Sequence, residues 1–136
     1  MGKKDISKAY RATTESFSGF EFVPIVPISA RKQSGIDTLL KQVIRVYEEM
    51  RKYADRHVLQ ELTRNLKPPV AGAILRINQI AIKPPIFKVR ITRSVDASYI
   101  KYLRHALRNH FGYTGAPILI RTEKVSIKKT MRMHKE

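Results

Sequence analysis

Apolar residues recur along this chain with two different periods, and the period of each stretch predicts its secondary structure. Three stretches carry an apolar residue at every third or fourth position, which is the spacing of one buried helix face. A weaker helical pattern lies near the N-terminus. Ser34 is a candidate cap for helix 36–53, and Ser94 or Asp96 for the last helix. The predicted helices cover residues 5–17, 36–53, 55–66 and 97–111.

Alternation with a period of two predicts the strands. In residues 86–92 apolar residues alternate with basic or polar ones, the pattern of a strand with one buried face. Residues 73–82 predict a second strand in which Leu75 and Ile77 face one way. We expect these two strands to pair, and a third strand to follow Pro117.

The stretch FEFVPIVPIS, residues 20–29, is almost continuously apolar. Such a run predicts a strand that is buried on both faces, as in a parallel sheet. Pro24 and Pro27 restrict it to an edge position or a strand end, because proline cannot donate to the ladder. An apolar strand without neighbours would be an exposed edge, so this prediction requires something to cover it.

Charge separates the two halves of the chain. The 136 residues carry 27 Lys and Arg against 11 Asp and Glu, a net charge of +16. Residues 1–66 hold 12 basic and 8 acidic groups, whereas residues 67–136 hold 15 and 3. Much of this charge is interleaved with apolar residues in segments that should fold, which favours a structured surface that binds a polyanion, most commonly a nucleic acid. An anionic membrane surface is the alternative partner, disfavoured because the cations alternate along strands as well as lining a helix.

Composition also excludes several classes of function. The chain has no cysteine, which rules out disulfide scaffolds, thiol catalysis and cysteine-based zinc sites. His105 and His110 are five residues apart, off the spacing that places two ligands on one helix face, so no metal site is expected. The apolar runs are shorter than the roughly 20 residues of a bilayer span. We therefore expect a soluble protein of the cytoplasm or an organellar matrix, without a membrane partner.

Eight basic residues are candidates for contact with RNA. Arg76, Lys88 and Arg90 should share the open face of the sheet, while Lys101, Arg104 and Arg108 flank the apolar stripe of helix 97–111. Both sets also have an ordinary interpretation, as the solvated side of a sheet or a helix. No acidic residue lies between Asp96 and Glu123, so ion pairs within the helix do not account for its cations. The full set of candidates is Arg76, Lys88, Arg90, Lys101, Arg104, Arg108, Arg121 and Lys124.

Two segments together resemble a known family. FVPIVPISARKQSGIDTLL, residues 22–40, resembles the last strand, the fifth guanine-nucleotide motif and the last helix of a translation-factor-class GTPase domain. The following KPP, the basic helix and GYTGAPILIR resemble the C-terminal KH-like domain of the EngA (Der) family of tandem GTPases. The resemblance covers roughly residues 20–124. It implies an α/β (α+β) fold, a KH-like three-stranded sheet with two helices, preceded by a strand–helix remnant of a GTPase domain.

This resemblance divides the chain into three parts. Residues 1–53 would be a partial GTPase-like C-terminal segment, with its strand at 20–29 and its helix at 36–53. Residues 54–124 would be the RNA-binding KH-like domain, and residues 125–136 a mobile basic tail. Gly112-Tyr113-Thr114-Gly115 spells the G-x-x-G of classical KH domains, but it joins a helix to a strand, so a simple turn is expected.

This sequence departs from the family in its guanine-nucleotide motifs. No G-x-x-x-x-G-K-[ST] loop occurs, and neither D-x-x-G nor N-K-x-D is present. The resemblance leaves only a nucleotide-binding remnant at Ser29, Ala30 and Arg31. We therefore expect no cofactor and no hydrolysis in this chain, GTP and Mg²⁺ belonging to the full-length parent. The chain is expected to be either a C-terminal part or a short natural relative.

The resemblance implies two functions. In the first, the module binds ribosomal RNA during assembly of the large ribosomal subunit, by electrostatic docking of its cations on phosphates. In the second, it is a regulatory interface that packs against the GTPase domains of the parent protein and senses their nucleotide state. Neither sets an oligomeric state. For the first, replacing Arg104 and Arg108 should abolish binding and spare the fold, because neither lies on the apolar stripe.

Overall fold

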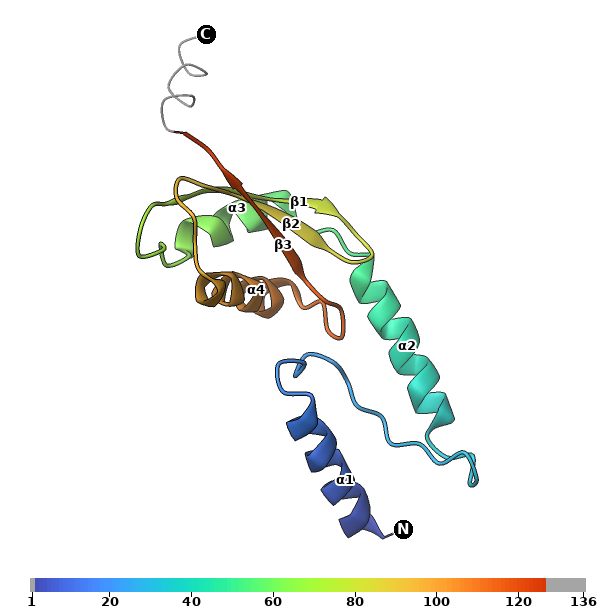
Figure 1. Cartoon of the computed structure of the whole chain (residues 1–136). Coiled ribbons are helices and arrows are strands. Elements are labelled where there is room, and N and C mark those ends of the chain that lie inside the picture. Colours follow the sequence, from blue (N-terminus) through green and yellow to red (C-terminus); the bar gives the residue numbers. More distant parts are fainter. Residues whose placement is uncertain (1, 127–136) are drawn as a thin grey trace.

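A three-stranded sheet organises the second half of the chain, and two helices pack on one of its faces (Figure 1). The computed structural model describes residues 2–126. The sheet has the spatial order β1-β2-β3, with β1 antiparallel to β2 and β2 parallel to β3. Its strands are β1 (Ile74–Ala81), β2 (Ile86–Ile91) and β3 (Leu119–Lys124), and the helices are α3 (Arg56–Asn65) and α4 (Ala97–Phe111). The predicted α+β class is confirmed.

Local sequence explains where both helices begin. The Asp55 carboxylate accepts from the backbone N–H groups of His57 and Val58 at 2.9 and 3.0 Å, and the Asp96 carboxylate accepts from that of Tyr99 at 2.8 Å. Each cap satisfies N–H groups that have no partner inside the helix. Helix α4 then crosses from β2 to β3, the kind of connection that parallel strands need.

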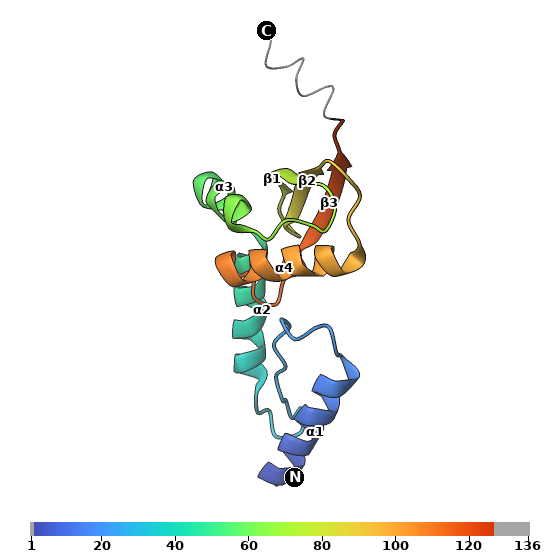
Figure 2. The same ribbon diagram turned by 90° about the vertical axis from the view of Figure 1, so that its left-hand side faces the viewer.

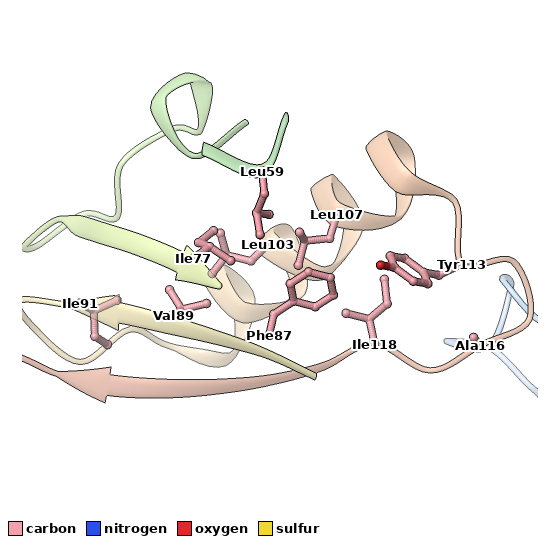
Figure 3. Close-up of a cluster of buried hydrophobic side chains, with 10 residues drawn as sticks. All are labelled: Leu59, Ile77, Phe87, Val89, Ile91, Leu103, Leu107, Tyr113, Ala116 and Ile118. Atoms are coloured by element: carbon pink, nitrogen blue, oxygen red, sulfur yellow. The ribbon is translucent and has the colours of Figure 1, made fainter. Parts of the chain in front are cut away.

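The core lies between the sheet and the two helices. Figure 3 shows side chains of α3, α4, β1 and β2 converging there. Side chains of the turn before β3 join them. Phe87 and Val89 of β2 are completely buried, as the alternation predicts, and Leu103 of α4 packs with them. Tyr113 is also completely buried and meets the Phe87 ring edge-on, with 6.0 Å between centroids. The loop 112–118 is therefore part of the core.

Strand β1 departs from strict alternation. Its register with β2 shifts between Ile74 and Arg76, so one extra residue, Leu75, is accommodated there. Such a bulge turns the following side chains over relative to the preceding ones. Ile77 is buried, but Leu75 is 45% exposed, so the prediction that these two face the same way is wrong.

Residues 2–53 contain two helices and no strand. They are α1 (Lys3–Ser16) and α2 (Ile36–Met50), close to their predicted positions, with Gly35 rather than Ser34 at the N-cap of α2. The strand predicted over 20–29 does not form; only Ser29 makes an isolated bridge, to Ser34. Pro24 and Pro27 remove two ladder donors, and no strand of the described residues lies beside the segment to pair with it.

The predicted buried face of α2 is uncovered in the part of the chain that the structure describes. Ile36, Leu40, Val43 and Tyr47 are 37–57% exposed. Helix α2 projects away from the sheet (Figure 2). None of its residues is buried, although its apolar positions recur with helical spacing as predicted.

Hydrogen bonds nevertheless join the first half to the second. The N–H of Lys83 donates to the carbonyl of Met50 at 3.1 Å, and the N–H of Gly115 donates to that of Phe22 at 2.7 Å. Gly115 has φ +78°, and a Cβ there would overlap the Val46 side chain. Glycine therefore suits both the backbone angle and the close approach. No helix of residues 2–126 has the length and apolarity that crossing a membrane demands.

Candidate nucleic-acid interface

The register of the sheet gathers four of the predicted cations on the face that the helices leave open. Arg76 pairs with Arg90 across β1 and β2, and Lys88 pairs with Arg121 across β2 and β3. Partners in a ladder point to the same side of a sheet. Because the residues that alternate with Lys88 and Arg90 are the buried Phe87, Val89 and Ile91, this side is opposite the core. We call Arg76, Lys88, Arg90 and Arg121 the open-face cluster.

One carboxylate lies within this cluster. Glu123 lies opposite Arg90 in the register, and its Oε2 is 2.9 Å from Arg90 Nε and 3.3 Å from Lys88 Nζ. Hydrogen bonds from Arg90 and then Lys88 lower the pKa of Glu123. The carboxylate orders the two cations but neutralises only one charge. The open face thus retains a net positive charge, and Arg121 has no ion pair within residues 2–126.

Arg104 and Arg108 donate hydrogen bonds to backbone carbonyls of the segment between α4 and β3. Arg104 Nε donates to the Ile118 carbonyl at 3.0 Å, and Arg108 donates through its two terminal nitrogens to the carbonyls of Tyr113 and Ala116 at 2.7 and 3.0 Å. The Arg108 guanidinium also lies 3.9 Å from the centroid of the Phe22 ring. Burial, and then the charge of Arg104, lower the pKa of Arg108. These hydrogen bonds argue against the expectation that both arginines could be replaced without harm to the fold, because they tie α4 to the turn before β3.

Lys101 and Lys124 lie away from the open-face cluster. Both side chains are exposed, but α4 covers the opposite face of the sheet, so Lys101 belongs to a different surface. Lys124 pairs with the buried Ile91, which places it on the core side of β3, three residues beyond Arg121. The predicted set of eight therefore divides between surfaces. The part of the basic tail from residue 127 onwards lies outside the described residues.

The predicted nucleotide-binding remnant, Ser29, Ala30 and Arg31, lies at the N-terminal end of α2. Ser29 and Ser34 exchange backbone hydrogen bonds of 3.0 and 3.1 Å around a tight turn that contains Ala30 and Arg31. The 15 residues of α2 separate this turn from the sheet by about 22 Å. With no phosphate-binding loop in the sequence, these residues do not fit GTP and Mg²⁺.

The Gly112–Gly115 segment is a turn from a helix into a strand, as predicted. Tyr113, in its middle, has φ +55° and is completely buried, so its side chain is directed into the core. Its hydroxyl lies 3.3 Å from the carbonyl of Lys52 and 3.4 Å from Gln79 Oε1. The geometry differs from a G-x-x-G loop that clamps a nucleic-acid backbone.

Burial raises the pKa of Tyr113 to about 12, against a hydrogen bond with Gln79 that lowers it. A folded-state pKa above the ordinary value of about 10 adds stability that is complete below pH 10 and is lost as the pH rises towards 12. We expect the unfolding free energy of the unmodified chain to fall by about 1 kcal/mol more between pH 9 and 11 than that of Tyr113→Phe. Urea unfolding at several pH values measures this difference, and parallel curves for the two proteins would contradict it.

A groove beside the open face contains residues that the sequence pattern did not single out. It lies between α3 and β1 and has a volume of about 490 Å³. Tyr53, Arg56 and Asn78 line it together with Arg76 and Arg90 of the open-face cluster. Tyr53 follows α2, which ends at Met50 and not at residue 53 as predicted, and Arg56 is the first residue of α3. Neither is one of the apolar residues whose spacing predicts these helices. The alternation of Asn78 with Ile77 predicts that Asn78 faces out with Arg76, and its pairing with Lys88 in the register agrees.

Comparison with known proteins finds one family that matches the region from α3 to β3. Residues 56–122 match the family described as "KH-domain-like of EngA bacterial GTPase enzymes, C-terminal". The chain is 32% identical over 135 residues to the protein named GTPase Der of Thermoanaerobacter sp. (strain X514), covering 90% of this chain and 31% of that relative. It is 35% identical over 137 residues to GTPase Der of Lactobacillus delbrueckii subsp. bulgaricus (strain ATCC BAA-365 / Lb-18), covering 91% and 32%. The chain thus spans about a third of the length of these relatives.

Proposed function

Since this chain belongs to the EngA/Der family through its C-terminal KH-like domain, we propose that the open-face cluster binds ribosomal RNA and that the protein acts in assembly of the large ribosomal subunit. Ribosomal RNA is the partner that the family suggests. The proposal concerns the KH-like domain, and GTP hydrolysis with Mg²⁺ is proposed only for a parent that carries the whole GTPase domains.

The observation that supports RNA binding is the placement of the open-face cluster. Within residues 2–126, four cations from three strands share one uncovered sheet face with a single carboxylate. Arg121 offers a planar fork of donors that matches two phosphate oxygens, whereas Lys88 offers a compact point charge. Contacts of this kind position the protein on the RNA backbone and carry little sequence information.

A salt titration tests this function. With four phosphates neutralised, the logarithm of the association constant should fall with the logarithm of salt concentration with a slope of about −3.6 for duplex RNA segments. Binding of a ribosomal RNA fragment to the full chain is measured by fluorescence anisotropy, with and without GTP and with heparin as competitor. A slope close to zero, or displacement by heparin with no preference for RNA, would contradict the proposal.

The regulatory function rests on a different observation, the uncovered apolar face of α2. That helix is bonded to the KH-like domain, because Lys52 Nζ donates to the Phe111 carbonyl at 3.0 Å while Glu49 holds the same ammonium at 2.7 Å. A GTPase domain packed on α2 would then be coupled to the RNA-binding domain. Adding the GTPase domains of a Der relative in trans tests this. Association that differs between GDP and GTP supports it, and no association opposes it.

A further inference from the structure

The groove between α3 and β1 is continuous with the open face. Arg76 and Arg90 belong both to the open-face cluster and to the groove, which adds Arg56 as a third arginine. No carboxylate lines the groove. The nearby Asp55 caps α3 through one carboxylate oxygen. Of the Arg90 nitrogens, only Nε is bonded to Glu123. Three arginines therefore line one groove, and the donors they have left match an anion.

An exposed tyrosine stands at the same place. Tyr53 is 70% exposed and has no aromatic ring stacked on it within residues 2–126. Asn78, an amide that can both donate and accept, lines the groove beside it. A planar ring with an open face, an amide and neighbouring arginines are the groups that receive an unstacked base and its phosphate.

The segment that carries Tyr53 is held in place from both sides. Gln79 Oε1 accepts from the N–H of Ala54 at 2.6 Å, and Gln79 Nε2 donates to the carbonyl of Lys52 at 3.0 Å. The residue after Ala54 is the N-cap Asp55, which fixes the start of α3. Tyr53 thus has an ordered backbone although its side chain is in solvent. Such pre-organisation reduces the ordering cost of binding.

We propose that this groove accommodates one unpaired nucleotide of the bound RNA, with its base stacked on Tyr53, its base edge at Asn78 and its phosphates at Arg56 and Arg76. The volume of about 490 Å³ is in the range of small-molecule sites and suits a single nucleotide. The inference rests on the proposed function, because Arg76 and Arg90 serve both surfaces. It adds a preference: RNA with a bulged base binds more tightly than a continuous duplex.

The test uses the full chain and two RNA hairpins that share one structured tetraloop, one with a fully paired stem and one with a single bulged nucleotide in its stem. We expect the bulged hairpin to bind roughly tenfold more tightly, and Tyr53→Ala to lose this preference. Tyr53→Phe should retain it, since stacking needs the ring and not the hydroxyl. Tyr10→Ala is the matched control, because Tyr10 is also exposed, at 51%, but lies on α1.

A fluorescent 2-aminopurine at the bulge gives a second readout. Its emission should be quenched on binding to the unmodified chain and to Tyr53→Phe, and not on binding to Tyr53→Ala. Equal affinity for the two hairpins, or an unchanged preference in Tyr53→Ala, would overturn the nucleotide site while leaving the proposed RNA binding intact. Failure to bind either hairpin at low salt would overturn both.

Discussion

Reversing the charges of Lys88 and Arg121 together should weaken RNA binding by a factor of about 60 at 0.1 M salt. The two residues face each other across β2 and β3, and both side chains are accessible on the open face. If each neutralises one phosphate, losing both removes about 1.8 from the slope of log K against log salt, which corresponds to this factor at 0.1 M. Anisotropy titrations of Lys88→Glu/Arg121→Glu at four salt concentrations measure the affinity and the slope.

The matched control keeps the change in net charge and moves it elsewhere. Lys101→Glu/Lys124→Glu also alters the charge by four units, but these residues lie off the open face. We expect it to change affinity several-fold at most, through the general field of the protein. Glu123→Gln should act in the opposite direction and tighten binding, because it releases Lys88 and Arg90. Equal losses in the two double variants would mean that binding depends on net charge alone.

Arg108→Ala should lower the unfolding free energy by about 3 kcal/mol, a large change for a replacement on a helix flank. The guanidinium donates to the carbonyls of Tyr113 and Ala116 and covers the Phe22 ring. Its removal leaves both carbonyls without these partners, and a hydrogen bond from a charged donor contributes about 1.5–3 kcal/mol. Urea unfolding followed by circular dichroism measures the loss.

Two further variants sharpen this prediction. Arg108→Lys should be intermediate, because a single ammonium cannot reach both carbonyls as the fork does. Lys101→Ala, on the same helix but exposed, should change stability by less than about 0.5 kcal/mol. An Arg108→Ala protein as stable as the unmodified chain would show that the turn does not depend on these bonds.

The elements that depend on local signals could be predicted from the sequence. Helix α4 occupies 97–111 because the Asp96 cap and the spacing of its apolar residues are both local. Strand β2 alternates cleanly because Phe87, Val89 and Ile91 all face one core. The shared face of Arg76, Lys88 and Arg90 followed from the same alternation, extended across two strands, whereas Arg121 joins them through the β2–β3 register.

The predictions that failed concern interactions between residues that are distant in the sequence. The apolar run 20–29 indicates a need for burial but does not reveal whether a neighbouring strand exists, and the described residues provide none. The bulge at Leu75 is a property of the β1–β2 register and not of β1 alone. Arg108 was correctly placed on a helix flank, yet its acceptors are backbone carbonyls, which leave no mark on a pattern of side chains.

Within residues 2–126, helix α2 is attached to the KH-like domain at one end only, so a small tilt displaces its other end by several ångströms. Its C-terminal end is bonded at Met50 and Lys52 to the sheet turn and to α4, while its far end carries the Ser29–Ser34 turn. A tilt of ten degrees about that fulcrum moves the far end of the 15-residue helix by about 4 Å. Lys52 is at the same time the residue whose carbonyl Gln79 holds, one position before Tyr53. A partner that tilts α2 would therefore shift the backbone directly before Tyr53.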